Sequence, residues 1–170
     1  MNIDTLLKPG RVNLIMQELA RYRVDVAGLQ EVRWRNSGEM TIENYKLIFS
    51  GRQDAKGTEG VALCVRTQLA GSLVSYQAIS SRLLSARFRV GRNHFCSVIV
   101  CYAPTEEVDE EDKGEFYSTF NACIDRTCSR DSLLILGDFN ARVGSAHSTW
   151  SGIIGPFGGS ETNSNGENLL

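Results

Sequence analysis

The sequence predicts an α/β fold built as one domain. An amphipathic helix precedes a buried strand near the amino end, the middle of the chain is rich in strands, and a second helix with a further apolar strand follows. The chain has 170 residues, of which 42% are hydrophobic and 22% charged. This size and composition are those of one globular domain, and they exclude disordered, collagen-like and coiled-coil proteins.

The first predicted helix covers residues 11–23. Its apolar side chains recur at helical spacing with polar residues between them: Val12, Ile15, Met16, Leu19 and Tyr22. Residues 25–30 follow after a very short connection and form an apolar run that is typical of a buried strand. A helix joined so closely to a buried strand indicates a layered α/β arrangement.

The middle of the chain is predicted to contain four further strands. They are expected at Tyr45–Ser50, Gly60–Arg66, Leu83–Val90 and Phe95–Tyr102. The last of them ends at Ala103-Pro104, because proline lacks the N–H that would continue the pairing.

The second half is predicted to begin with a helix over Lys113–Cys128. A short strand at Leu133–Leu136 follows, and it is so apolar that we expect it to be buried. Residues 144–166 are rich in glycine and serine and are expected to form a long loop, after which a turn leads into a helix. The acidic run at 106–112 is interpreted as the amino end of the second helix, since carboxylates there complement the helix dipole.

Charge is divided unevenly along the chain. Residues 1–100 carry 14 Lys and Arg against 8 Asp and Glu, whereas residues 101–170 carry 4 against 12. The stretch 60–105 contains no acidic residue but five arginines: Arg66, Arg82, Arg87, Arg89 and Arg92. Such a stretch can face phosphates, but on charge alone a solvated sheet face is the favoured interpretation.

Cysteine content and hydropathy bear on the cellular setting. The five cysteines are odd in number and form no Cys-x-x-Cys pair, so neither a disulfide framework nor a zinc site is favoured. The sequence shows no membrane-spanning run and no signal peptide, so we expect a soluble protein of the nucleus or cytoplasm without a membrane partner. The oligomeric state stays open.

Two acidic motifs follow directly on predicted buried strands. They are Gln30-Glu31 and Gly137-Asp138-Phe139-Asn140. Polar groups at the carboxyl ends of adjacent core strands build sites in α/β folds, so we expect the two motifs to converge. Carboxylates with neutral amides suit Mg²⁺, which polarises a phosphoryl oxygen during phosphodiester hydrolysis while a second carboxylate orients water.

Each motif also has a structural alternative. Glu31 alone is explained by pairing with Arg33 or Arg35, and Asp138 alone by a turn that caps the loop after its strand. The occurrence of four polar strand-end sites in one short chain, with Asn2 and Tyr102 as the other two, favours a functional site.

Six short blocks occur in an order that resembles the signature of the endonuclease/exonuclease/phosphatase superfamily. The most similar branch is that of non-LTR retrotransposon endonucleases and craniofacial development protein 2-like proteins. The blocks are residues 2–6, Gly28–Trp34, Gly60–Val65, Cys101–Thr105, Leu136–Ala141 and Asn165–Leu170. The resemblance extends over essentially the whole chain. It implies a four-layered α/β sandwich, in which two packed β-sheets are flanked by helices.

The resemblance also implies roles for five residues and a cofactor. Glu31 resembles the metal-binding glutamate, and Asn2 the amide that supports the metal and the phosphate. Tyr102 resembles the catalytic tyrosine that approaches the scissile phosphate. Asp138 resembles the aspartate that orients the attacking water, and Asn140 the amide that holds the phosphoryl oxygen. The implied cofactor is Mg²⁺ or Mn²⁺.

One family feature is missing from the sequence. Members of the family carry an Asp-His pair near the end of the domain, but this chain has only His94 and His147, and neither follows an aspartate. We therefore expect residues 1–170 to be a partial domain that is truncated at its carboxyl end, with one sheet edge open.

The resemblance predicts a divalent-metal-dependent phosphodiesterase, foremost a DNA endonuclease of the retrotransposon type, with DNA or alternatively RNA as its partner. Two alternatives stay open. One is a catalytically inactive, retrotransposon-derived fragment that retains binding. The other is a phosphatase or lipid phosphodiesterase of the same superfamily.

Overall fold

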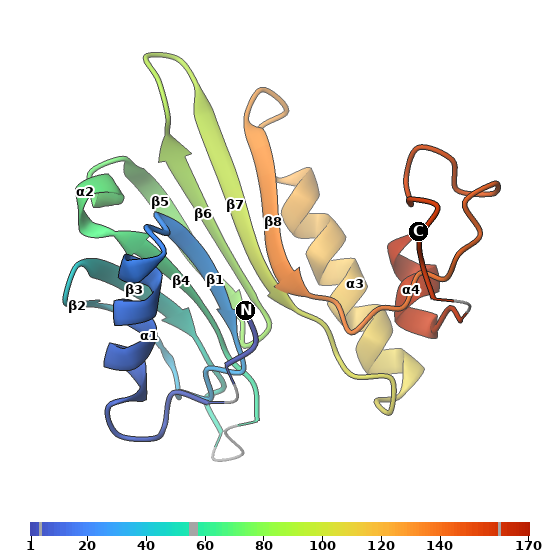
Figure 1. The fold of residues 1–170 in the computed structure, drawn as a ribbon, viewed down its shortest axis with the longest axis horizontal. Helices are drawn as coiled ribbons and strands as arrows, with labels where there is room; N and C mark the ends of the chain where they lie inside the picture. Colours follow the sequence, from blue (N-terminus) through green and yellow to red (C-terminus); the bar gives the residue numbers. More distant parts are fainter. Residues whose placement is uncertain (4, 55–57, 160) are drawn as a thin grey trace.

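The computed structural model describes residues 1–3, 5–54, 58–159 and 161–170 (Figure 1). The first half contains α1 (Arg11–Arg21), β1 (Val26–Gln30), β2 (Ser37–Ile42), β3 (Tyr45–Ser50), β4 (Val61–Arg66) and α2 (Thr67–Ala70). The second half contains β5 (Leu73–Ser80), β6 (Leu83–Arg89), β7 (Phe95–Tyr102), α3 (Glu110–Asp125), β8 (Ser132–Asp138) and α4 (Ser164–Leu169).

The strands form two four-stranded sheets. The order in the first sheet is β1-β4-β3-β2, with every neighbouring pair antiparallel. The order in the second sheet is β5-β6-β7-β8, in which β7 and β8 are parallel. Because parallel neighbours need a crossover connection, α3 lies between β7 and β8 in the chain. The parallel register places Tyr102 directly beside Asp138 at the carboxyl ends of these two strands.

The two sheets and their flanking helices form layers (Figure 1), and three hydrophobic clusters lie between these layers. The first cluster packs α1 against the first sheet, and its members include Met16, Leu19, Leu29 and Leu47. The second lies between the two sheets and includes Leu63, Val65, Leu84 and Val100. The third packs α3 against the second sheet and includes Ile99, Cys101, Phe116 and Phe120. The α/β sandwich of two packed sheets with flanking helices is therefore confirmed.

Gly28 allows β1 to approach the second sheet closely. A Cβ atom at this position would lie 2.8 Å from Leu136 Cβ and 3.2 Å from Val100 Cγ1. Any larger side chain would therefore push β1 away from β7 and β8. This contact between sheets brings the carboxyl end of β1 close to those of β7 and β8.

The predicted helices and strands are present, with shifts at their ends. The second helix begins earlier than expected, at Glu110, because Asp109 caps it by accepting a 2.9 Å hydrogen bond from the Asp112 amide. The acidic run thus lies at the helix start, as predicted. The strands β2 and β5 were not predicted, because most of their side chains are exposed and neither has the apolar pattern of a core strand.

The predicted burial of Leu133–Leu136 was wrong. In β8, Leu133, Leu134 and Ile135 expose 40%, 44% and 37% of their surface. Within the described part of the chain, β8 pairs only with β7 and forms an edge of the second sheet. The apolar composition correctly indicated a strand, but its position at an edge leaves these side chains uncovered.

Three of the five arginines of the stretch 60–105 form ion pairs with acidic side chains. Arg66 pairs with Asp25, which directly precedes β1, whereas Arg82 pairs with Glu59. Arg87 donates two hydrogen bonds to the buried Asp131 carboxylate, at 2.6 and 2.9 Å. These ion pairs support the interpretation of this stretch as ordinary sheet surface.

No helix among the described residues is long and apolar enough to cross a bilayer.

Candidate active site

The Glu31 carboxylate lies directly after β1 and accepts three hydrogen bonds. Its Oε1 accepts from Asn2 Nδ2 at 2.5 Å and from the Tyr102 hydroxyl at 3.2 Å, and its Oε2 accepts from Arg33 Nη2 at 2.9 Å. Burial alone would raise the pKa of Glu31, but the hydrogen bonds from these three donors lower it overall. The carboxylate is therefore ionised at neutral pH.

Asn2 reaches Glu31 because the start of the chain runs alongside β1. Asn2 forms a parallel bridge with Gln30, and the Ile3 amide donates to the Gln30 carbonyl at 3.2 Å. This pairing places the Asn2 side chain beside the residue that follows β1. The structure thus brings the two predicted metal-site residues, Asn2 and Glu31, into direct contact.

Tyr102 is the last residue of β7 in the second sheet, and its hydroxyl contacts the Glu31 carboxylate. Burial and the neighbouring negative charge of Glu31 raise the pKa of the Tyr102 hydroxyl. The phenol therefore stays protonated at neutral pH and donates to the carboxylate. Its backbone amide donates to the Arg82 carbonyl at 2.9 Å, which fixes the end of β7 against the start of β6.

Asp138 and Asn140 form a tight turn at the end of β8. The Asn140 amide donates to Asp138 Oδ1 at 3.0 Å, and the turn requires a positive φ of 47° at Asn140. Asn140 Nδ2 donates to the Ala103 carbonyl at 2.9 Å, while the Ala103 amide donates to the Asp138 carbonyl at 2.9 Å. An amide nitrogen carries two hydrogens, so the bond to Ala103 uses one of them.

The five predicted site residues gather in two adjoining groups. Asn2, Glu31 and Tyr102 are joined by direct hydrogen bonds, whereas Asp138 and Asn140 are bonded to each other and to Ala103. The two groups meet at the end of β7, where Tyr102 and Ala103 are consecutive. The strand ends converge across the two sheets, because β1 and β8 belong to different sheets, and not along one sheet as expected.

Both structural alternatives are also visible as contacts. Glu31 pairs with Arg33, and Asp138 accepts the hydrogen bond of the turn that follows its strand. Glu31 contacts Asn2 and Tyr102 as well as Arg33, so its ion pair with Arg33 does not prevent the five residues from lying close together. The contacts show which of the five residues touch one another, while their assignment to a functional site stays a prediction.

Arg82 and Glu59 support Tyr102 and were not predicted. Arg82 Nη1 donates to the Tyr102 carbonyl at 3.2 Å, and its Cζ lies 5.2 Å from the centre of the Tyr102 ring. Glu59, which is only 9% exposed, accepts from Arg82 at 3.0 Å, from Arg52 at 3.0 Å and from Ser81 at 2.5 Å. Arg82 had been noted only as part of a charged stretch, and no sequence signal marked Glu59.

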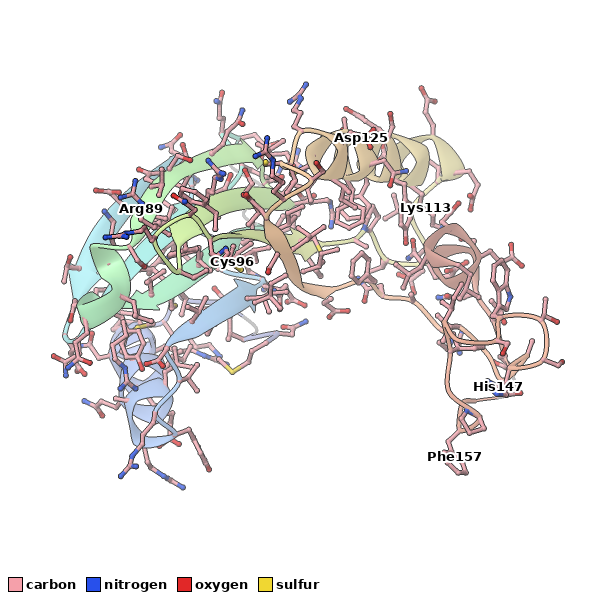
Figure 2. The ribbon with its side chains drawn as sticks, turned by 90° about the horizontal axis from the view of Figure 1, so that it is seen from above. Arg89, Cys96, Lys113, Asp125, His147 and Phe157 are labelled. Carbon is pink, nitrogen blue, oxygen red and sulfur yellow. The ribbon has the colours of Figure 1, made fainter. Side chains whose placement is uncertain are left out.

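The donor set determines which metal ion fits here. In the part of the chain that the structure describes, no group of three or more His, Cys, Asp or Glu side chains gathers to hold a metal. Figure 2 shows His147 on the loop that extends beyond α4, and its Nδ1 lies 2.8 Å from the Ile154 carbonyl. A zinc-type site does not fit, but Mg²⁺ and Mn²⁺ do, because Mg²⁺ commonly binds through one or two carboxylates and completes its shell with water and phosphate.

Comparison with known proteins agrees with this arrangement. Residues 2–165 match the model of the Endonuclease/Exonuclease/phosphatase family. The chain belongs to this family. Craniofacial development protein 2 from Bos taurus is 31% identical over 164 residues, which are 96% of this chain and 27% of that protein. The chain thus spans about a quarter of the length of this curated relative.

Solved structures share the fold of this family member. The catalytic domain of Xenopus laevis APE2 has a TM-score of 0.57 and 17% identity, and the match covers 83% of this chain and 57% of that one. The D. rerio TDP2 structure in complex with a single-strand DNA product has a TM-score of 0.59 and 14% identity, over 90% of this chain and 63% of that one. At these identities the likeness shows the fold alone.

Proposed function

We propose that this domain hydrolyses phosphodiester bonds in a nucleic acid with the help of Mg²⁺ or Mn²⁺. The observation that carries the proposal is the ionised Glu31 carboxylate, which Asn2 and Tyr102 hold beside the strand end that bears Asp138 and Asn140. An oriented carboxylate with neighbouring amides provides ligands for a hard cation and donors for phosphate oxygens. Membership of the family supports the same reaction class.

In the proposed reaction, Glu31 and Asn2 would hold the divalent cation, which when bound polarises the phosphoryl oxygen. Asp138, at the end of β8 beside the end of β7, orients the attacking water and accepts its proton. As the water oxygen bonds to phosphorus, the bond from phosphorus to the leaving ester oxygen breaks, and solvent water supplies the proton to that oxygen. Asn140 donates from its side-chain amide to a phosphate oxygen as negative charge develops there. Tyr102 keeps Glu31 oriented and lies next to the scissile phosphate.

DNA is the substrate that we propose first, cleaved endonucleolytically as by retrotransposon enzymes. The structural neighbour TDP2 binds a single-strand DNA product, which supports a nucleic-acid substrate. RNA is the alternative. The nucleus or the cytoplasm is the location proposed for such an activity.

A second candidate function is binding of nucleic acid without turnover. Arg33 occupies Glu31 Oε2, and neither histidine contributes a hydrogen bond to the five-residue cluster within the described residues. Because an imidazole contributes roughly 10²- to 10⁴-fold as a general acid or base, a cluster without one has a weaker means of assisting the leaving group.

The experiment that separates the two candidates is a nicking assay with the purified 170-residue chain. Supercoiled plasmid is incubated with the chain and either Mg²⁺, Mn²⁺ or a chelator. The hydrolase proposal predicts nicking with the metal ions and none with the chelator. No nicking above the protein-free background in any of the three conditions, together with retardation of the plasmid on a gel, would establish binding without turnover. A small phosphate monoester in parallel tests for a phosphatase.

A further inference from the structure

Two asparagines at the start of α4 reach the turn that carries Asn140. The sequence predicts the start of a helix here, and Asn165 begins one of the six blocks that resemble the family signature, but neither residue was given a role and the proposed reaction uses neither. Asn163 caps α4, and Asn165 lies in its first turn with none of its surface exposed. Both side chains are 23 or more residues away from Asn140 in the chain, and both donate to its carbonyl oxygen.

Asn163 uses the two ends of its side-chain amide for different contacts. Its Oδ1 accepts from the Gly166 amide at 2.9 Å, which is the helix cap, and from the Arg142 amide at 2.7 Å. Its Nδ2 donates to the Asn140 carbonyl at 2.9 Å. A helix cap needs only the oxygen, so the amide nitrogen makes a contact that capping does not require.

Asn165 joins the ends of β7 and β8. Its Nδ2 donates to the Pro104 carbonyl at 2.8 Å and more weakly to the Asn140 carbonyl at 3.5 Å. Pro104 follows Tyr102 by two residues, and Asn140 follows Asp138 by two. The buried Tyr117 hydroxyl of α3 donates to the Asn165 carbonyl at 3.0 Å, which holds this residue from the other side.

The rest of α4 is fixed to α3 and to the Asn140 turn. A Cβ atom at Gly166 would lie 1.9 Å from the Arg142 carbonyl oxygen, so only glycine permits this approach. The Lys113 ammonium donates to Ser164 Oγ at 2.8 Å, to Glu110 Oε1 at 3.0 Å and to the Glu106 carbonyl at 2.9 Å. Figure 2 shows Lys113 at the end of α3 that faces α4.

We infer that Asn163 and Asn165 are positioning residues for the proposed hydrolytic site, a role that rests on the proposed function. They hold the backbone carbonyls of Asn140 and Pro104, and thereby fix the Asn140 side chain relative to Tyr102. Asn140 adopts a left-handed backbone conformation that is uncommon for residues other than glycine, so the turn benefits from external contacts that keep it in place.

The test compares two substitutions that make the same chemical change at different places. Asn163→Asp keeps the oxygen that caps α4 and removes the donor to Asn140. The control Asn168→Asp makes the same change at an exposed position of α4. We expect Asn163→Asp to lower kcat for metal-dependent cleavage by about 10-fold with KM changed less than about twofold, because misplacement of a reacting group acts on the rate of the chemical step. Asn168→Asp keeps the original kcat.

A neutral second variant and a readout without catalysis complete the test. Asn163→Ser also retains a cap acceptor but is too short to reach Asn140. For both Asn163 variants, hydrogen exchange measured by NMR is expected to become about 10-fold faster at the Asn140 and Ala103 amides, since local opening there loses a restraint. Exchange at these amides that equals that of Asn168→Asp would overturn the inference. If the original chain shows no cleavage but the exchange rates change as expected, the proposed function is wrong. The conclusion that Asn163 restrains the Asn140 turn is then still supported.

Discussion

The Tyr102 hydroxyl donates to Glu31 Oε1 at 3.2 Å although Tyr102 ends β7 and Glu31 follows β1, which belong to different sheets. β1 and β7 meet across the interior of the sandwich, where Gly28 permits a close approach of β1 to Val100 and Leu136. The hydrogen bond therefore depends on how the two sheets are packed. Changes at this contact or at the residues that support it are expected to alter activity before they alter the fold.

Tyr102→Phe removes this hydrogen bond and retains the ring. We expect cleavage to fall by at least about 10-fold, because Glu31 loses one of the donors that orient it, while the free energy of unfolding changes by about 1 kcal/mol or less. Single-turnover cleavage and urea unfolding measure the two effects. Tyr76→Phe is the matched control, since the Tyr76 hydroxyl also bonds a glutamate, Glu39, but on the exposed sheet surface. Equal loss of activity in both variants would contradict the role of Tyr102.

Arg82→Met removes the donor that links Glu59 to Tyr102. The nearly buried Glu59 carboxylate then keeps fewer partners, so we expect a loss of about 1–3 kcal/mol in the free energy of unfolding. Glu59→Gln in the same chain is expected to recover part of this loss, because it removes the uncompensated charge. A double-mutant cycle by urea unfolding measures the coupling, and strictly additive losses would show that the two side chains do not interact.

The Asp131 carboxylate makes stability depend on pH in acid. Hydrogen bonds from Arg87, in the first place, lower its pKa from 3.8 to about 2. A pKa that is lower in the folded state gives stability that is present above the unfolded value and is lost as the pH falls through the folded value. The midpoint of urea unfolding should therefore decline between pH 3.8 and about 2, and Asp131→Asn should make this decline shallower. An unchanged slope would show that Asp131 does not contribute to it.

Gly28→Ala tests the contact between the sheets directly. The added Cβ would lie 2.8 Å from Leu136 Cβ, so we expect a loss of about 1–3 kcal/mol from overpacking and a lower rate of cleavage. Gly114→Ala is the control, because a Cβ at this exposed position of α3 meets no atom within 4 Å. It should stabilise the helix by about 0.5–1 kcal/mol. Two variants of equal stability would contradict the close approach of β1.

The sequence was informative about elements that bury an apolar face. The helix at Arg11–Arg21 and the strands β3 and β7 lie where the spacing of apolar residues predicts them. It was uninformative about β2 and β5, whose side chains are largely exposed, because periodicity reports burial. The apolar strand β8 shows the opposite case, since local composition does not reveal whether a strand lies at the edge of its sheet.

The sequence identifies some residues of the candidate site but not the long-range contacts that support them. Glu31, Asp138 and Asn140 were identifiable because they lie at or just after the end of an apolar strand and carry chemically suitable groups. The contacts that Arg82 and Asn165 make with the site were not predictable, because they join residues far apart in the sequence: Arg82 with Tyr102, and Asn165 with Pro104. Only the packing of β6 and α4 against the strand ends makes them neighbours of the site.

The most direct test of the central claim is the rate at which the chain with Glu31→Gln cleaves a labelled DNA duplex in Mn²⁺. This substitution keeps the size of the side chain and removes the charge that would bind the cation. We predict a fall of at least about 10²-fold relative to the original chain, while Glu18→Gln on the exposed face of α1 retains the original rate. Cleavage by Glu31→Gln at the original rate would contradict the assignment of this carboxylate to a metal-dependent hydrolytic site.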